Sequence, residues 1–189
     1  MVDHREEVVR KLARLRELGA EGELERRWEE GSEDEEDLYN AGCLSLPDGV
    51  LPEGEAPAER ELRALYRLSD GPRFGMVALR RQGSTFRMQA VDVEGRPIHE
   101  GTRLVLGAAG DGVYILLDSG TGAVTVYDSL YFKYGQESGV RLECDSLFEF
   151  VDTAALGPRY RELWGPAESE WWAADPWWNY LVEIGFAHP

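Results

Sequence analysis

The stretch from Leu104 to Asp128 limits the possible folds more than any other part of the chain. It reads LVLGAAGDGVYILLDSGTGAVTVYD, in which apolar runs are separated by short turns of Gly, Asp, Ser and Thr. Runs rich in Val, Leu and Ile favour strands, and an Asp-Gly pair between two such runs is a typical hairpin turn. Strands joined by so few residues must be antiparallel. We therefore predict three sequential antiparallel strands over residues 103–108, 113–117 and 123–127.

Helical and strand patterns alternate on both sides of this stretch. Apolar residues recur at helical spacing over residues 8–18, 58–68 and 146–156, and a short helix is predicted through Tyr180. The runs 74–81 and 85–93, separated by a Gln-Gly-Ser turn, predict a further hairpin. Together these patterns predict an α+β fold, in which a mostly antiparallel sheet is flanked by helices and followed by a Trp-rich C-terminal segment.

The length of 189 residues favours a single domain over residues 1–189, since domains usually hold about 100–200 residues. Within it we distinguish a core at about 58–156, an acidic N-terminal extension at 1–57 and a Trp-rich tail at 157–189. A chain of this length needs neither a metal nor a disulfide to fold. Cys43 and Cys144 are not at zinc-ligand spacing, so we expect two free thiols and no metal.

Acidic residues give the chain a net charge of −16. Residues 1–59 hold 18 acids and 7 bases, whereas residues 60–189 hold 18 acids and 13 bases. Such a charge repels nucleic acid and anionic membrane surfaces and attracts basic proteins, although it could serve solubility alone. The densest acidic run is predicted either as a mobile loop or as a recognition arm, and its central acids are Glu33, Asp34, Glu35, Glu36 and Asp37.

Targeting signals do not stand out in the sequence. No apolar run reaches 18 residues, and the first residues, MVDHREEVVRKLARLREL, are charged throughout. A membrane span needs about 20 apolar residues, and a signal peptide needs an apolar core. We therefore expect a cytoplasmic protein.

Catalytic and cofactor motifs are not expected. The three histidines, His4, His99 and His188, form neither an HxxxH pair nor a Ser/His/Asp order. The Gly-rich stretches 107–112 and 118–122 lack the lysine and helix of a phosphate-binding loop, and hairpin turns explain their glycines. Asp118 follows an apolar strand, where it either accepts backbone N–H bonds in the turn or faces a partner.

Tryptophans gather in the tail, which holds five of the six. Tryptophan supplies a large buried area to a core and is also a preferred anchor of protein interfaces. Because adjacent positions do not share a face, we expect at least one residue of each neighbouring pair to be partly exposed. The candidates for partner binding in the tail are Trp171, Trp172, Trp177 and Trp178.

Three segments in this order resemble the SUKH superfamily, which includes yeast cell-wall-assembly regulators and many bacterial immunity proteins. The first, LRALYRLSDGPRFGMVAL at 62–79, is similar to the family's Leu-rich helix, turn and strand, with Gly71 and Gly75 at the junction. The second is the stretch 104–128, with Gly112 and Gly122 in its turns, and the third is CDSLFEFVDTAAL at 144–156. The resemblance covers roughly residues 58–156 and assigns a structural turn to each of these four glycines.

The resemblance implies a non-enzymatic protein without a cofactor. Bacterial members of the superfamily bind a cognate toxin domain, often a nuclease or a deaminase, and block it by occlusion. The expected partner is thus a basic toxin domain. An alternative is a regulatory or scaffold module that binds an endogenous cytosolic protein, as the yeast relatives do. A hydrolase or nucleotide-binding enzyme is a third hypothesis that no motif supports. The oligomeric state is not predicted.

Overall fold

The computed structural model describes residues 2–31, 44–49, 59–165 and 171–188. For residues 28–31, 59, 134 and 171 it describes the backbone alone. Among the described residues, no helix combines the length and the apolar character that crossing a membrane would require.

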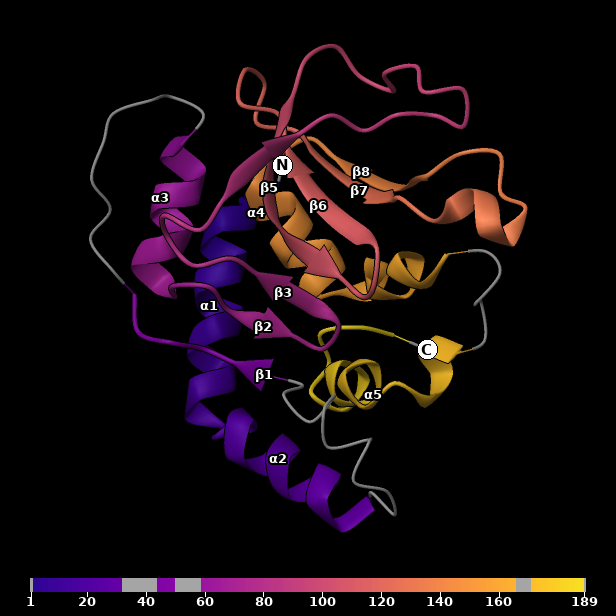
Figure 1. The fold of residues 1–189 in the computed structure, drawn as a ribbon. Coiled ribbons are helices and arrows are strands. Elements are labelled where there is room, and N and C mark those ends of the chain that lie inside the picture. Colours follow the sequence, from indigo (N-terminus) through magenta and orange to yellow (C-terminus); the bar gives the residue numbers. More distant parts are fainter. Residues whose placement is uncertain (1, 32–43, 50–58, 166–170, 189) are drawn as a thin grey trace.

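An antiparallel sheet of eight strands forms the centre of the described structure (Figure 1). The strands run in the spatial order β1-β2-β3-β5-β6-β7-β8, and β4 pairs with β5 beside that path. Their bounds are β1 (Leu44–Ser45), β2 (Arg73–Phe74), β3 (Val77–Leu79), β4 (Phe86–Met88), β5 (Arg103–Ala109), β6 (Val113–Leu117), β7 (Val124–Asp128) and β8 (Val140–Cys144). The predicted α+β class is confirmed.

The three sequential strands predicted from residues 103–128 are confirmed as β5, β6 and β7. Leu117 pairs with Val124 across the second turn, and every pairing in the sheet is antiparallel. The turn glycines Gly112 and Gly122 have φ of +69° and +85°. A side chain is strained in this left-handed region, which explains why glycine occupies both turns.

The predicted hairpin of residues 74–81 with 85–93 is wrong. Gly75, at φ +58°, turns the chain immediately after Phe74, so the first run splits into β2 and β3. β3 and β4 both pair with β5, at Val77–Ala109 and Phe86–Val105 respectively. An apolar run hides a two-residue turn because residues on both sides of the turn remain buried. The edge strand β8 was also not predicted.

Helices precede and follow the sheet. Their bounds are α1 (His4–Glu17), α2 (Ala20–Gly31), α3 (Glu59–Leu68), α4 (Leu147–Glu149), a π-helix (Phe150–Ala155) that continues α4, and α5 (Pro176–Glu183). Short 3₁₀ helices lie at Tyr131–Tyr134, Pro158–Trp164 and Trp171–Ala174. The helical segment that begins at Leu147 is capped by Ser146, whose Oγ accepts the Glu149 N–H at 3.0 Å.

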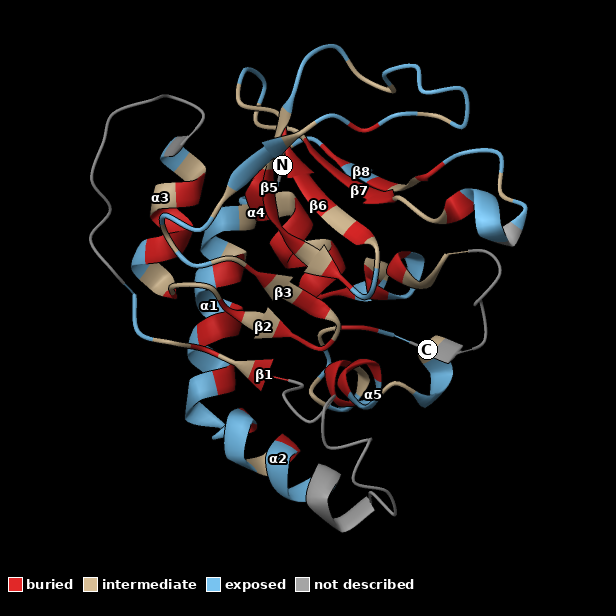
Figure 2. Ribbon diagram, viewed as in Figure 1, coloured by how far each residue is buried: buried red, intermediate tan, exposed pale blue. Residues whose placement is uncertain are grey.

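Helices cover one face of the sheet, where α1 and α4 lie behind the strands in Figure 1. The main core is on this face and includes Leu12 of α1, Ile115 of β6 and Phe150 of the π-helix, each almost fully buried. Figure 2 shows the buried residues concentrated on the strands and on the inner sides of these helices. The opposite face carries a small apolar cluster that includes Leu116 and Tyr127.

The C-terminal segment packs onto the main core through Trp177. Its indole is fully buried, donates from Nε1 to the Ala155 carbonyl at 2.9 Å, and lies 6.3 Å from the Phe74 ring. Asp175 caps α5 by accepting the Trp178 N–H at 2.8 Å, and burial raises the pKa of this carboxyl. The aromatic segment is thus held to the sheet by packing and by directed hydrogen bonds.

The expectation that Trp177 or Trp178 is partly exposed is wrong. Trp178 is also buried, with 3% of its surface accessible. Neighbouring helix positions do point in different directions, but both sides of α5 are covered. Trp177 faces the core, and Trp178 meets the half-buried Trp172 edge to face at 5.3 Å between ring centroids.

A Gly75→Ala substitution should destabilise the protein more than Gly122→Ala does. At Gly75 an added Cβ would overlap the Tyr160 hydroxyl and lie 2.7 Å from Trp177 Cβ, whereas at Gly122 no atom lies within 4 Å. Both positions have positive φ, so both substitutions cost about 1–2 kcal/mol of backbone strain, and only Gly75→Ala adds steric overlap. Urea unfolding of the two variants measures the difference. Equal losses would show that the Trp177 contact is readily deformed.

Candidate functional site

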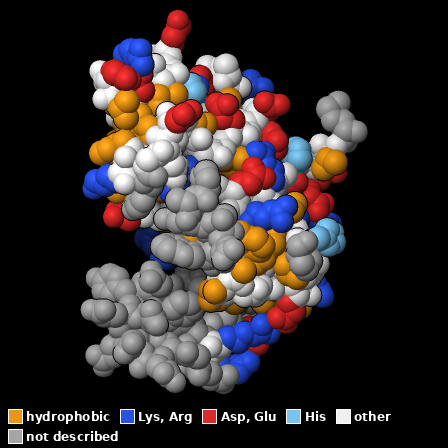
Figure 3. Space-filling view, turned by 90° about the vertical axis from the view of Figure 1, so that its right-hand side faces the viewer, with side chains coloured by type: hydrophobic (Ala, Val, Ile, Leu, Met, Phe, Trp, Pro, Cys, Tyr) orange, Lys and Arg blue, Asp and Glu red, His pale blue; other side chains and the backbone are white. Residues whose placement is uncertain are grey.

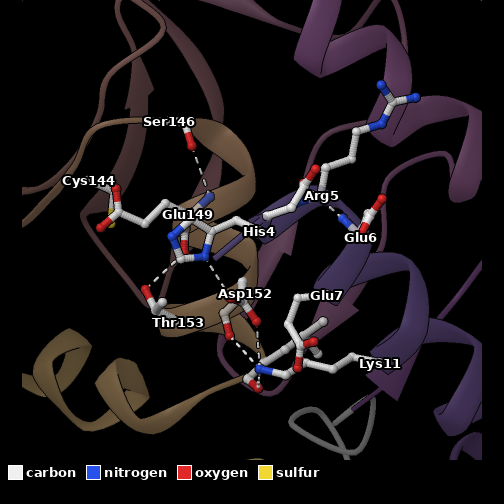
Figure 4. Close-up of polar contacts among 12 residues, drawn as sticks. His4, Arg5, Glu6, Glu7, Lys11, Cys144, Ser146, Glu149, Asp152 and Thr153 are labelled. Atoms are coloured by element: carbon white, nitrogen blue, oxygen red, sulfur yellow. Dashed lines mark hydrogen bonds and ion pairs between the residues drawn. The ribbon is translucent and has the colours of Figure 1, made fainter. Parts of the chain in front are cut away.

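A buried polar cluster joins α1 to the π-helix (Figure 4). Lys11 Nζ lies 2.7 Å from Asp152 Oδ1, and only 8% and 7% of the two side chains are exposed. The same ammonium group donates to the backbone carbonyls of Asp152 and Leu156, each at 2.9 Å. Two hydrogen bonds to carbonyls and one close carboxylate oxygen thus surround the ammonium group, and they offset part of the cost of burying its charge.

The π-helix supplies the carbonyl groups of this cluster. Its wider turn is closed by a bond from Leu156 N–H to the Val151 carbonyl, five residues earlier, at 2.9 Å. The helix ends there, and the last carbonyls of a helix have no donor within it. Lys11, which lies on α1, donates to two of these carbonyls. The residue that pairs with Asp152 therefore also caps the C-terminal end of the π-helix.

His4 completes the cluster from the first turn of α1. Its Nδ1 lies 2.7 Å from Asp152 Oδ2, and a third of its side chain is exposed. The nearby hydroxyls are used inside the helix: Ser146 accepts the Glu149 N–H, and Thr153 donates to the Glu149 carbonyl at 2.8 Å. Because a carboxylate only accepts, His4 donates from Nδ1 to Asp152.

Sequence reasoning missed this cluster, although a signal was present. Lys11 is one of only two lysines and lies on the apolar stripe that also contains Val8, Leu12 and Leu15. A lysine on the buried face of a helix needs a buried partner, so a carboxylate could have been sought elsewhere in the chain. The sequence does not indicate which of the 36 acids fills that role.

A groove of about 530 Å³ opens beside His4, between the start of α1, α3 and α4. Arg5 lies over the Phe148 ring, 6.0 Å from its centroid, and Arg60 and Glu61 line the same groove. Glu61 is already used, because its carboxylate accepts the Leu147 N–H at 2.9 Å. The groove is thus formed by both apolar and charged side chains.

A second cleft, of about 700 Å³, lies between residues 135–141 and the 3₁₀ helix Pro158–Trp164. We call it the Trp172 cleft, because the half-buried indole of Trp172 lines it together with Glu137, Arg161 and Glu162. Arg161 lies over the Trp172 ring at 5.9 Å from its centroid, and Trp178 supports that ring from the core side. A rigid aromatic side chain is thus presented beside carboxylates.

The Trp172 cleft belongs to the side of the molecule at the right of Figure 1, where the chain segments at 131–134 and 171–174 lie. Figure 3 shows this side, with hydrophobic side chains in groups among acidic and basic ones. Mixed apolar and polar character of this kind is usual for non-obligate protein interfaces.

Except for Asp118, the other residues proposed for partner binding are either buried or outside the described residues. Trp177 and Trp178 are buried and offer no accessible ring, which corrects their assignment to a binding surface. The side chain of Trp171 and the acids Glu33, Asp34, Glu35, Glu36 and Asp37 lie outside the described residues. The structure therefore brings only Trp172 of the four tail candidates to a described cleft.

Asp118 has the turn role that the sequence suggested. Its Oδ1 accepts the N–H groups of Gly120 at 2.7 Å and Thr121 at 3.1 Å, and these bonds hold the pKa of the carboxyl below its ordinary value. Arg103 lies 3.5 Å away and adds to that effect. The four assigned turn glycines all have positive φ, including Gly71 at +77°.

Comparison with known proteins identifies no relative: no family model matches, and neither the curated proteins nor the solved structures contain a match. Among the described residues, no three His, Cys, Asp or Glu side chains come together as metal ligands would.

Replacing Lys11 by Met should destabilise the protein by about 3–5 kcal/mol, because Asp152 would remain as a buried charge without its cation. Combining Lys11→Met with Asp152→Asn should recover part of that loss, since the amide is neutral. Arg14→Met is the matched control on α1: its ion pair with Glu17 is exposed, at 3.5 Å, and should contribute less than about 1 kcal/mol. Urea unfolding measures all three, and an equal cost for Lys11→Met and Arg14→Met would contradict the prediction.

Because of His99, the protein should become less stable as the pH is lowered. Its Nε2 is buried without a hydrogen-bond partner among the described residues, and burial followed by the nearby Arg103 lowers the pKa of its imidazole. The folded state therefore favours neutral His99, so stability is present at high pH and is lost as pH falls through about 6.5 and below. Urea unfolding across this range should show a smaller loss for His99→Gln than for wild type. The exposed His188→Gln serves as control, and identical profiles for wild type and His99→Gln would contradict the assignment.

Proposed function

We propose that this chain is a non-enzymatic immunity protein that binds a basic toxin domain in the cytoplasm and blocks it by occlusion. The observation that carries the proposal is the Trp172 cleft, in which a supported indole stands beside Glu137 and Glu162. Tryptophan is enriched among the residues that dominate the binding energy of protein interfaces. The three-segment resemblance to the SUKH superfamily supplies the class of partner.

Charge supports the same proposal. The chain carries −16, of which −7 falls on the described residues, since these hold 27 acids and all 20 bases. The other nine acids fall in residues 32–43, 50–58 and 166–170. Nucleases that grip phosphates are basic, so a strongly acidic inhibitor would associate with them rapidly at low salt.

The alternative is a regulatory or scaffold module that binds a resident cytosolic protein. The same cleft and the same charge would serve such a partner, so the two proposals differ in what is bound rather than in how. Identification of the partner separates them: a toxin domain of a large secreted protein favours immunity, and resident proteins alone favour regulation.

Tagged protein recovered from its native cells at low salt should retain a basic domain identified by mass spectrometry. Trp172→Ala should weaken binding of the purified partner about tenfold, because the indole is the anchor of the cleft. Binding should also weaken as salt is raised. Phe86→Ala, which removes an exposed ring from β4, is the matched control and should bind the basic domain as wild type does.

Neutralisation is tested separately from binding. Expression of the recovered domain should arrest growth, and co-expression of this protein at equal level should restore it, with Trp172→Ala restoring it less well. Binding that is insensitive both to salt and to Trp172→Ala would overturn the assignment of the cleft and of the electrostatic contribution. A partner whose activity is unaffected by saturating protein would overturn occlusion.

A further inference from the structure

Arginines without acidic neighbours are concentrated between residues 71 and 91. This segment contains four arginines and no Asp or Glu, in a chain whose net charge is −16. Arg87 lies in β4, the Arg80 guanidinium lies over the ring of Phe86 in β4, and Arg81 follows Arg80 in the chain. Together with Phe86 they form a surface that we call the β4 edge. It is a locally basic surface on an acidic protein.

Arg80, Arg81 and Arg87 differ in ion pairing from eight other arginines of the described structure. Eight arginines elsewhere face a carboxylate within 4 Å, namely Arg10, Arg14, Arg26, Arg27, Arg96, Arg103, Arg141 and Arg159. In the part of the chain that the structure describes, Arg80, Arg81 and Arg87 have no such carboxylate. The acids that flank the segment in sequence are both engaged: Asp70 accepts the Gln82 N–H at 2.7 Å, and Asp92 accepts the Arg96 Nε–H at 2.7 Å.

The polar contacts that these arginines do make are to neutral oxygens. Arg80 donates to the Ser84 carbonyl at 3.2 Å, and Arg87 donates to Ser119 Oγ at 3.0 Å. The Arg80 guanidinium lies 4.7 Å from the centroid of the Phe86 ring, and its Nε is buried without a partner among the described residues. The positive charges are thus held in place but not neutralised.

β4 also has an unpaired strand edge. It pairs with β5 on one side, at Phe86–Val105, Arg87–Leu104 and Met88–Arg103, and no other described strand pairs with it. Phe86 is 44% exposed, and Val93, a few residues further on, is 62% exposed. An edge strand with accessible N–H and C=O groups can accept another strand.

We propose that the β4 edge binds an extended acidic segment of a partner protein by strand addition. The segment would pair its backbone with β4, place alternate carboxylates against Arg81 and Arg87, and cover Phe86 with an apolar side chain. Alternation follows from the two-residue period of a strand. This surface is distinct from the Trp172 cleft and has the opposite charge, so the protein would hold two different partner segments.

Charge complementarity favours an acidic peptide over nucleic acid. Both are anionic and would be attracted by the three arginines. A polyphosphate backbone, however, carries its charge over many nucleotides and would meet the field of the whole chain at −16. A short peptide needs only the few residues that β4 can pair with, and it gains backbone hydrogen bonds that a phosphate backbone lacks.

A fluorescent peptide of about eight residues that alternates Glu and Val tests the proposal with the intact protein. It should bind in fluorescence anisotropy, more weakly as salt is raised, and the matching Lys–Val peptide should not bind. The double variant Arg81→Glu/Arg87→Glu should weaken binding at least about tenfold. Arg10→Glu/Arg14→Glu makes the same charge change on α1 and should leave binding within about twofold.

A Glu–Val peptide with N-methylated valines distinguishes strand addition from charge attraction. The N-methyl groups remove backbone N–H donors, and the charge of the peptide stays the same. Weaker binding of this peptide supports the proposal, and equal binding overturns it. Tighter binding of a single-stranded oligonucleotide of equal charge would also overturn it, as would self-association of the protein abolished by Arg81→Glu/Arg87→Glu. Because the probe is unrelated to the basic partner, failure here leaves the proposed function standing.

Discussion

The buried ion pair between Lys11 and Asp152 is the contact on which the arrangement of the helices depends. It connects α1, which precedes every strand of the sheet in the chain, to the helical segment that follows the last strand. An ion pair in such a place contributes little net stability when complete, but losing one partner is costly. It therefore acts as a specificity device, since any other placement of α1 would leave a buried charge unpaired.

The same contact explains the unusual end of the helical segment. A π-helix costs hydrogen-bond quality, and its terminal carbonyls need donors from elsewhere. Lys11 supplies them to the Asp152 and Leu156 carbonyls. Ala155, the last residue of the π-helix, accepts the Trp177 indole N–H, so one short stretch of chain receives both α1 and α5. The N-terminal and C-terminal helices are thus held to the sheet at neighbouring positions.

Charge is distributed on two scales. Across the whole chain, acids exceed bases by 16. Locally, eight arginines of the described structure face a carboxylate within 4 Å, whereas those at the β4 edge do not and leave a basic surface on an acidic protein. Net charge governs the long-range attraction of a partner, whereas a local cluster of arginines without ion pairs governs which partner groups bind to that surface. Those two levels underlie the two surfaces proposed, the Trp172 cleft for a basic partner and the β4 edge for an acidic segment.

Several features could be predicted from the sequence because they are local. The strands β5, β6 and β7 follow from apolar runs separated by turns with glycine, and the Ser146 cap follows from residues three apart. The Asp118 turn is local in the same way. In each case the hydrogen-bonding partners lie a few residues apart, so their spacing in the sequence is also their spacing in space.

Features that join distant parts of the chain were decided by the tertiary structure alone. The choice of Asp152 as the partner of Lys11, the pairing of both β3 and β4 with β5, and the burial of Trp178 beneath Trp172 each depend on which surfaces meet. Sequence periodicity assigns a residue to a face of its own element, but it does not determine what covers that face. The sequence by itself therefore determined the overall charge and those elements whose contacts are local, such as β5, β6 and β7, and the packing of the elements decided which charges and rings remain accessible.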